Sequence, residues 1–180
     1  SGQLGDGTHN QALSPVQVLD LSDATALSVA AGEAHSCVLL DDGHVRCWGS
    51  NSSGEPGMGG TDPQTGTIAT HLTGHIVDLS AGWSFSCGMT DLGSAWCWGS
   101  NGNGRLGAGG GVGTLSATPL PVLVLEDGTA LSAGGTHACG VQSNGIMWCW
   151  GGNADGQLGQ GAASTGSATP VRVLEPAEHH

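Results

Sequence analysis

Short apolar runs alternate with clusters of glycine, aspartate and asparagine along the whole chain. Runs such as residues 26–30 and 37–40 are four or five residues long and end at turn-forming residues. A run of this length between turn residues is typical of a β-strand. An amphipathic helix needs apolar residues at a period of about 3.6 over ten or more positions, and no segment shows that pattern. The pattern therefore predicts an all-β chain of short strands and tight turns.

The same segments recur with a period of about 50 residues. A segment of the form Ala-Gly-x-x-x-x-Cys stands at residues 31–37, 81–87 and 133–139, and a Cys-Trp-Gly tripeptide begins ten residues after each of these cysteines. A Gly-x-x-Gly element occurs at residues 2–5, 54–57, 104–107 and 156–159. A Pro-Val type strand follows it at residues 15–18, 119–122 and 170–173, whereas residues 67–72 replace that strand after the second copy. About four strands in each repeat match a blade of a β-propeller.

We place the repeats at about 1–53, 54–103 and 104–155, with a partial fourth repeat at 156–176, all within one domain of residues 1–180. Residues 177–180 are assigned to a tail or a tag remnant. Three cysteine hairpins but four Gly-x-x-Gly elements predict about three four-stranded antiparallel blades and one surplus strand, from either the N-terminal or the C-terminal copy. Because closed propellers usually have about four or more blades, we expect an incomplete propeller or one completed by assembly of copies. Such assembly would form a ring or a filament, and the alternative is a segment of a longer chain.

The hairpin turns give the cysteines one common register. A three-residue turn at residues 41–43, with Gly43 at its left-handed position, sets the first cysteine directly opposite the second. The turns at residues 91–93 and 143–145 give the same register. The three predicted pairs are Cys37 with Cys47, Cys87 with Cys97, and Cys139 with Cys149. Opposed residues lie about 4.5–5.5 Å apart, so each pair is within reach of a disulfide, which would contribute about 2–3 kcal/mol.

Metal binding and reduced core thiols are the alternatives for these cysteines. In the first repeat His35 and His44 lie nearby in sequence, but His44 is an odd number of residues from Cys47 and so points to the opposite face of its strand. The second cysteine hairpin has no histidine, so a four-ligand zinc site cannot be built in the same way in all three repeats. An even number of cysteines at fixed spacing instead favours disulfides and an oxidising compartment.

These segments resemble the repeats of the regulator of chromosome condensation family. The resemblance is carried by Ala-Gly-x-x-His-Ser/Ala-Cys, by Cys-Trp-Gly-Ser/Gly-Asn and by Gly-Gln-Leu-Gly, and it covers nearly the whole chain. It implies a β-propeller, typically of seven blades. Members include a nuclear exchange factor for a small GTPase and bacterial inhibitors of β-lactamase, so the resemblance leaves the function open. The cysteine-bearing variety is similar to secreted or surface proteins of bacteria.

The charge excludes several classes of partner. The formal net charge is −12, and the only cations besides histidine are three arginines. Such a chain cannot neutralise a run of phosphates, so we expect no nucleic-acid binding. No stretch approaches the roughly 20 apolar residues of a membrane helix, and we expect no insertion into a membrane. Without lysine there is no P-loop, and no Gly-x-Ser-x-Gly motif is present, so we expect neither an enzyme nor a cofactor.

Two sets of residues are candidates for packing and for binding. Packing between blades is assigned to Trp48, Trp98, Trp150, His35 and His137, which recur at equivalent positions. The alternatives are an aromatic ligand-binding ring and catalytic histidines, but an active site is normally single. Contact with a partner is assigned to the less regular Trp83, Trp96 and Trp148.

The sequence therefore predicts a non-enzymatic protein-binding or structural module at the exterior or surface of a bacterial cell. Its partner would be another protein or further copies of itself. The alternative, guanine-nucleotide exchange or another regulatory activity on an enzyme partner, rests on the family resemblance alone.

Overall fold

The computed structural model describes residues 2–21, 24–57, 59–60, 64–69 and 74–174. Within these ranges the chain forms antiparallel β-sheets and one short 3-10 turn, η1 (Gly102–Gly104), which confirms the predicted all-β fold. None of the described helical structure is long and apolar enough to cross a bilayer. Sheet A contains β1 (Ala26–Ala31), β2 (His35–Leu40), β3 (Val45–Gly49) and β4 (Gln64–Ala69). Sheet B contains β5 (Ile76–Ala81), β6 (Phe85–Thr90), β7 (Ala95–Ser100) and β8 (Leu115–Pro121). Sheet C contains β9 (Gly128–Ala133), β10 (His137–Gln142), β11 (Met147–Asn153) and β12 (Ser164–Arg172).

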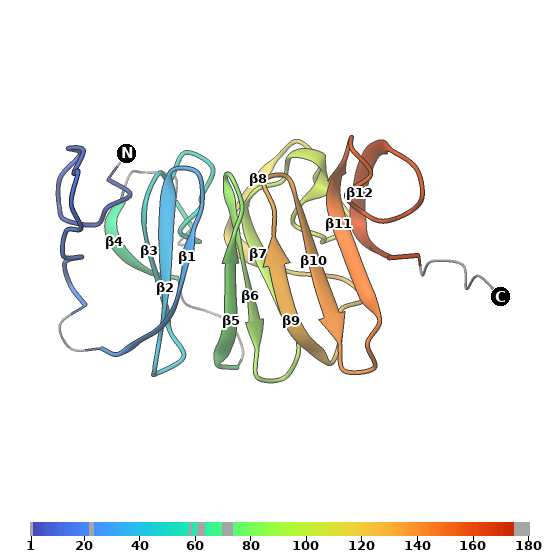
Figure 1. The fold of residues 1–180 in the computed structure, drawn as a ribbon, viewed down its shortest axis with the longest axis horizontal. Coiled ribbons are helices and arrows are strands. Elements are labelled where there is room, and N and C mark those ends of the chain that lie inside the picture. The colour runs from blue at the N-terminus through green and yellow to red at the C-terminus, as the bar shows by residue number, and fades with distance from the viewer. Residues whose placement is uncertain (1, 22–23, 58, 61–63, 70–73, 175–180) are drawn as a thin grey trace.

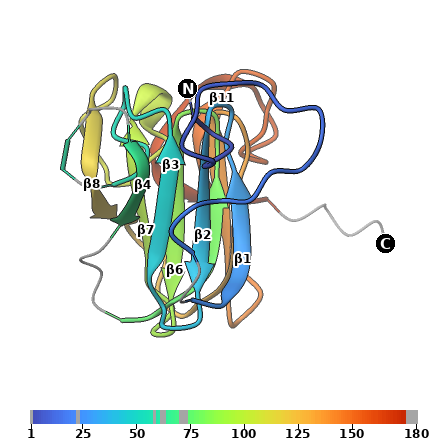
Figure 2. The same ribbon diagram turned by 90° about the vertical axis from the view of Figure 1, so that its left-hand side faces the viewer.

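The three sheets stand side by side in chain order, as blades of an incomplete propeller (Figure 1). Each sheet is a meander in which strands pair in sequence order. The first strands β1, β5 and β9 contact one another from sheet to sheet and form the inner edge. The view along the row in Figure 2 shows β4 and β8 on the opposite side from β1. The row therefore has an inner edge, an outer edge and, among the described residues, one sheet face at each end that no other sheet covers.

The hairpin registers agree with the turns predicted from the sequence. Gly43, Gly93 and Gly145 have φ angles of 79°, 77° and 82°, and only glycine adopts this region without strain. In each central hairpin the two cysteines are directly paired. The structure contains the three bridges Cys37–Cys47, Cys87–Cys97 and Cys139–Cys149, with Cα atoms 4.0–4.1 Å apart.

The sheets are out of phase with the sequence repeats. Residues 54–103 supply β4 of sheet A and the first three strands of sheet B, so each sheet takes its outer strand from the following repeat. The surplus element is the N-terminal copy, because β12 completes sheet C. The expectation of a surplus strand is wrong in one respect: residues 15–18 form no strand. Residues 67–72 lack the Pro-Val pattern, yet the part of them that lies in β4 pairs with β3, with Thr67 opposite Cys47. Residues 70–72 and 177–180 lie outside the described residues.

The core lies between the sheets, and the disulfides belong to it. The bridge of sheet A packs with Leu39 and Val45 against Leu79 and Trp98 of sheet B. The bridge of sheet B packs in the same way against sheet C, in a cluster that includes Met89, Leu131 and Trp150. Each sheet thus has two unlike faces, one that carries the disulfide and one that carries the tryptophan of the Cys-Trp-Gly tripeptide.

Candidate functional site

Each repeated tryptophan is held by a backbone carbonyl of the preceding Gly-x-x-Gly loop. The indole Nε1 of Trp98 donates to the carbonyl of Glu55 at 2.7 Å. The same bond joins Trp150 to Arg105 at 3.0 Å and Trp48 to Gln3 at 2.9 Å. The last glycine of the loop lies under the ring, and a Cβ on Gly57 would come within 2.8 Å of Trp98 Cδ1. This geometry favours packing over a ligand-binding ring, since the rings are buried and their polar atoms are already bonded. Trp98 and Trp150 pack between sheets, whereas Trp48 packs against Val18 and Leu21 of the N-terminal segment.

His35 is buried beside Ser86, in the interface between sheets A and B. Its Nε2 lies 2.9 Å from the Ser86 hydroxyl, which donates to the carbonyl of Glu55. The serine proton is therefore committed to that carbonyl, so Nε2 of the imidazole is the donor to Ser86. A nucleophilic serine needs the opposite arrangement, a proton shared with the histidine and access to substrate. Ser86 is fully buried, and the pair is structural.

The three repeats place different residues at the position of His35. The equivalent position in sheet B is Phe85, since both residues pair with the glycine of the Cys-Trp-Gly tripeptide. His137 of sheet C is only half-buried. Unlike the ring of His35, its ring makes no hydrogen bond to any residue in the described ranges. The site thus accepts either an imidazole or an apolar ring, which indicates a packing role.

Burial of His35 makes the stability of the fold dependent on pH. Removal from water lowers the pKa of His35, and the nearby Glu55 raises it by less; burial also lowers the pKa of His137. Below a pH of about 6.5 these histidines take up a proton in the unfolded chain, whereas in the folded chain they remain neutral to a lower pH. Stability is therefore complete above that pH and falls below it, by up to about 1.4 kcal/mol per pH unit for each histidine.

Replacing His35 with phenylalanine, the residue that sheet B uses, is expected to flatten this dependence. The measurement is the free energy of unfolding between pH 8 and about pH 5, above the range in which ordinary carboxylates titrate. His9→Phe, which changes an exposed histidine, should keep the wild-type slope. An unchanged slope in His35→Phe would show that His35 is not the responsible group.

A shallow depression lies at one end of the inner edge, where three equivalent turns meet. These turns connect the first and second strands of each sheet and contribute Gly32 and Glu33, Gly82 and Trp83, and Gly134 and Gly135 to a volume of about 320 Å³. We call this surface the rim. Trp83 is 57% exposed there. Its amide donates to the carbonyl of Gly135, and a Cβ on Gly135 would lie 2.6 Å from the indole. The ring is therefore exposed and held in place by the neighbouring turn.

The other two candidate contact residues lie elsewhere. Trp96 on β7 and Trp148 on β11 are half-buried within the row of sheets. Trp148 packs against the core between sheets B and C, and its Nε1 donates to Gln142 Oε1 at 2.9 Å. Of these three tryptophans, only Trp83 has a largely exposed side chain. Position along the repeat could have shown this, because residue 83 falls in a turn while 96 and 148 fall on strands.

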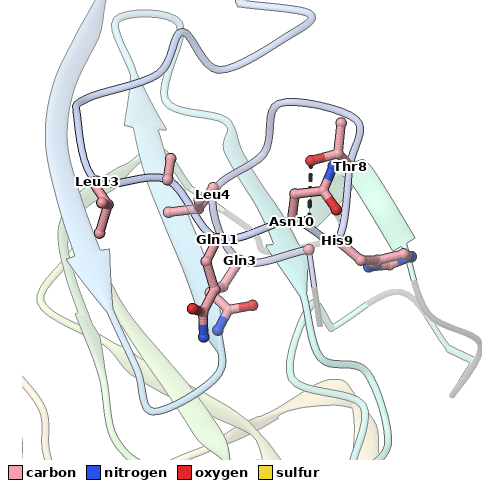
Figure 3. A pocket seen from close by; sticks show the side chains of 9 residues that line it. Gln3, Leu4, Thr8, His9, Asn10, Gln11 and Leu13 are labelled. Atoms are coloured by element: carbon pink, nitrogen blue, oxygen red, sulfur yellow. Dashed lines mark hydrogen bonds between the residues drawn. The ribbon is translucent and has the colours of Figure 1, made fainter.

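A second depression, of about 350 Å³, lies within residues 2–13 (Figure 3). Its walls include Gln3, Leu4, His9 and Leu13, and the backbone amide of Asn10 donates to the Thr8 hydroxyl across the loop. All its lining residues come from one segment, which folds back on itself and whose Gln3 carbonyl accepts the hydrogen bond from Trp48 Nε1. The pocket is assigned to the packing of that segment.

Comparison with protein families identifies the repeat. Profiles of the regulator of chromosome condensation (RCC1) repeat match residues 27–55, 76–105, 129–157 and 1–39, together more than half of the chain. Human probable E3 ubiquitin-protein ligase HERC6 is 32% identical over 155 residues, which is 83% of this chain and 15% of HERC6. The ultraviolet-B receptor UVR8 of Arabidopsis thaliana is 30% identical over 61 residues, covering 34% of this chain and 14% of the receptor.

Solved structures agree on the fold. The chain superposes on yeast RCC1 (Prp20) bound to Kap60 with a TM-score of 0.82 at 21% identity, covering 98% of this chain and 44% of that one. Human WBSCR16 gives a TM-score of 0.78 at 24% identity, covering 89% and 43%. The chain thus spans less than half the length of these proteins. The RCC1 repeat profiles match residues in each of the three sheets, and each sheet carries one disulfide. The chain therefore belongs to the RCC1 repeat family.

Proposed function

We propose that this chain is a non-enzymatic protein-interaction module that contacts its partner through the rim. The observation that carries the proposal is Trp83, a large aromatic side chain that is exposed yet fixed by Gly135. Rigid exposed aromatic residues are enriched among the anchors of protein interfaces, because they bury much area at little entropic cost.

The turn residues of the rim differ from sheet to sheet, whereas the sheets that carry the turns have the same structure. The sheets that carry these turns share the same strand registers, the same disulfide and the same buried tryptophan. The turn residues differ: they are Glu33 and Ala34 in sheet A, Trp83 and Ser84 in sheet B, and Gly135 and Thr136 in sheet C. Variable residues on a rigid scaffold are typical of binding surfaces. Arg46 donates to the Asp20 carbonyl and Arg105 to the Gly102 carbonyl, so both are engaged inside the chain. With a net charge of −12, the surface favours a cationic partner.

Yeast RCC1 (Prp20), a protein of this fold, has protein partners. It has been solved bound to Kap60, and its binding to Gsp1p and histones has been described. These partners are those of the yeast protein, and their common feature, that each is a protein, supports the class of partner proposed here. Guanine-nucleotide exchange rests on fold analogy alone and is not proposed.

We also propose that the chain works in an oxidising compartment, outside a bacterial cell or at its surface. The support is the pairing of all six cysteines within their own hairpins. Structural disulfides of this kind persist outside the reducing cytosol.

Trp83→Ala is expected to weaken partner binding by about 30-fold or more, the loss typical of an interface anchor. The test captures proteins from the secretome of the source with wild-type and variant chains as bait, and then measures the affinity of any protein that the wild type retains. Leu92→Ala is the matched control, since Leu92 is also an exposed apolar residue, 70% exposed, but lies in the β6–β7 turn at the opposite end of sheet B. Equal binding by the wild type and Trp83→Ala would exclude the rim as the contact surface.

A further inference from the structure

The rim places a carboxylate and an exposed indole in one depression. Glu33 and Trp83 are the equivalent residues of the first two turns, and both side chains are exposed. They line the same volume of about 320 Å³, and the third equivalent residue, Gly135, adds no side chain to it. Among the described residues nothing forms a hydrogen bond or an ion pair with the Glu33 carboxylate. Its charge is therefore available to a ligand.

The indole of Trp83 is held from one side. Sheet B stands between sheets A and C (Figure 1), and the ring lies against Gly135 in the turn of sheet C. The Trp83 amide donates to the Gly135 carbonyl at 3.2 Å, and a Cβ on Gly135 would lie within 3.0 Å of three indole atoms. Because sheet C covers one side of the ring, the open side is turned toward sheet A, which contributes Glu33.

Glycines form the floor between these two side chains. A Cβ on Gly32 would lie 2.6 Å from the carbonyl oxygen of Gly82, and a Cβ on Gly82 would lie 2.6 Å from that of Gly134. The three turns are therefore packed backbone against backbone, and no side chain of the floor fills the space above it. The volume of about 320 Å³ is at the lower end of the range of ligand pockets, about 300–1,000 Å³, which suits one long side chain of another molecule.

The chain supplies no cation of its own to this depression. None of the lining residues is an arginine or a histidine, and the sequence contains no lysine. The face of an indole attracts a cation, and a carboxylate forms charge-assisted hydrogen bonds with one. The chain itself contains a pairing of the first kind, since the Arg105 guanidinium lies over the Phe85 ring, 5.7 Å from its centre.

We propose that the rim binds an arginine side chain of the partner protein, with the guanidinium between the indole of Trp83 and the carboxylate of Glu33. The proposal rests on the proposed function and names the group of the partner that the rim takes. Arginine is favoured over lysine because a planar guanidinium can stack on an aromatic face while its N–H groups still donate to a carboxylate.

The test titrates the protein with three short peptides and follows the NMR signals of Trp83 and Gly135. The probes are acetyl-Gly-Arg-Gly-amide, the same peptide with lysine, and the same peptide with citrulline, which has the shape of arginine without its charge. The Trp83 indole signal is identified by its absence from Trp83→Phe. The arginine peptide is expected to shift both signals with the lowest Kd, and the citrulline peptide to bind about 5-fold or more weakly.

Two variants assign the binding to the two side chains. Glu33→Gln and Trp83→Ala should each weaken the arginine peptide by about 2–5-fold. Both change exposed residues, so both should fold, as checked by circular dichroism. Glu126→Gln is the matched control, because it removes the same charge from an exposed residue before β9, at the end of that strand away from the rim. It should bind the peptide as the wild type does.

Three results would overturn the proposal: no shift of the Trp83 and Gly135 signals, a citrulline or lysine peptide that binds as tightly as the arginine peptide, or equal binding by Glu33→Gln and Glu126→Gln. Its failure can be told apart from failure of the rim function. A captured partner that binds Trp83→Ala weakly but Glu33→Gln normally would exclude the arginine site and keep the rim as the contact surface. A partner that is insensitive to Trp83→Ala would exclude both.

Discussion

Replacing Trp98 with alanine is expected to lower the free energy of unfolding by about 3–5 kcal/mol. The ring is fully buried between sheets A and B, among Leu39, Ile76 and Leu79. Its removal leaves a cavity and takes away the indole donor from the carbonyl of Glu55, which keeps only the Ser86 hydroxyl. Chemical denaturation at neutral pH measures the loss.

Two further variants separate the causes of that loss. Trp98→Phe keeps most of the apolar volume and removes the N–H group, so it should cost less than the alanine variant by most of the cavity contribution. Trp83→Ala removes an exposed ring and should cost less than about 1 kcal/mol, in the range of surface substitutions. A Trp98→Ala loss as small as that of Trp83→Ala would place the ring in solvent and favour the ligand-binding interpretation.

Removing the central bridge by Cys87→Ala with Cys97→Ala is expected to cost about 3–4 kcal/mol. Opening a loop with a sequence separation of 10 costs about 2–3 kcal/mol through the greater freedom of the unfolded chain. The remaining loss of about 1 kcal/mol comes from the void left in the packed interface, since both cysteines are fully buried. Denaturation without reductant gives the value.

The bridge of sheet C is the matched control. Cys139 and Cys149 close a loop of the same separation, so the chain-entropy loss is the same, but this bridge lies on the uncovered face. Their double replacement by alanine should therefore cost only about 2–3 kcal/mol. Equal losses for the two bridges would show that burial between sheets contributes nothing, and no loss at either would show that the bridges do not form.

The pairing within each hairpin could be predicted to the residue because it depends only on residues that are close together in the sequence. Gly43 and its two equivalents fix the turn, the turn fixes the register, and the register pairs the cysteines. The surplus element could not be located in this way, because a strand exists only where a partner offers backbone hydrogen bonds. Residues 15–18 have the sequence of an outer strand, but no described strand pairs with them, and they are irregular.

The site was harder to predict than the fold. The tryptophan caps join residues about 43–45 positions apart, as in Trp98 and Glu55, and the rim brings together turns from three repeats. Neither kind of contact can be recognised from the spacing of residues along a short stretch of sequence. The sequence grouped Trp83 with Trp96 and Trp148, and only its position in a turn could have separated it from these two strand residues, whose exposure depends on the neighbouring sheet.

The phase difference between sheets and repeats has a consequence for how such chains evolve. Any window of one period, wherever it starts, contains the residues equivalent to one disulfide-bridged hairpin, one outer strand and one loop that accepts the next indole. A gene duplication or deletion of one such window adds or removes a complete set of contacts, and the neighbouring sheets meet the same surfaces as before. The number of sheets can therefore change by whole units without any compensating mutation at the junction.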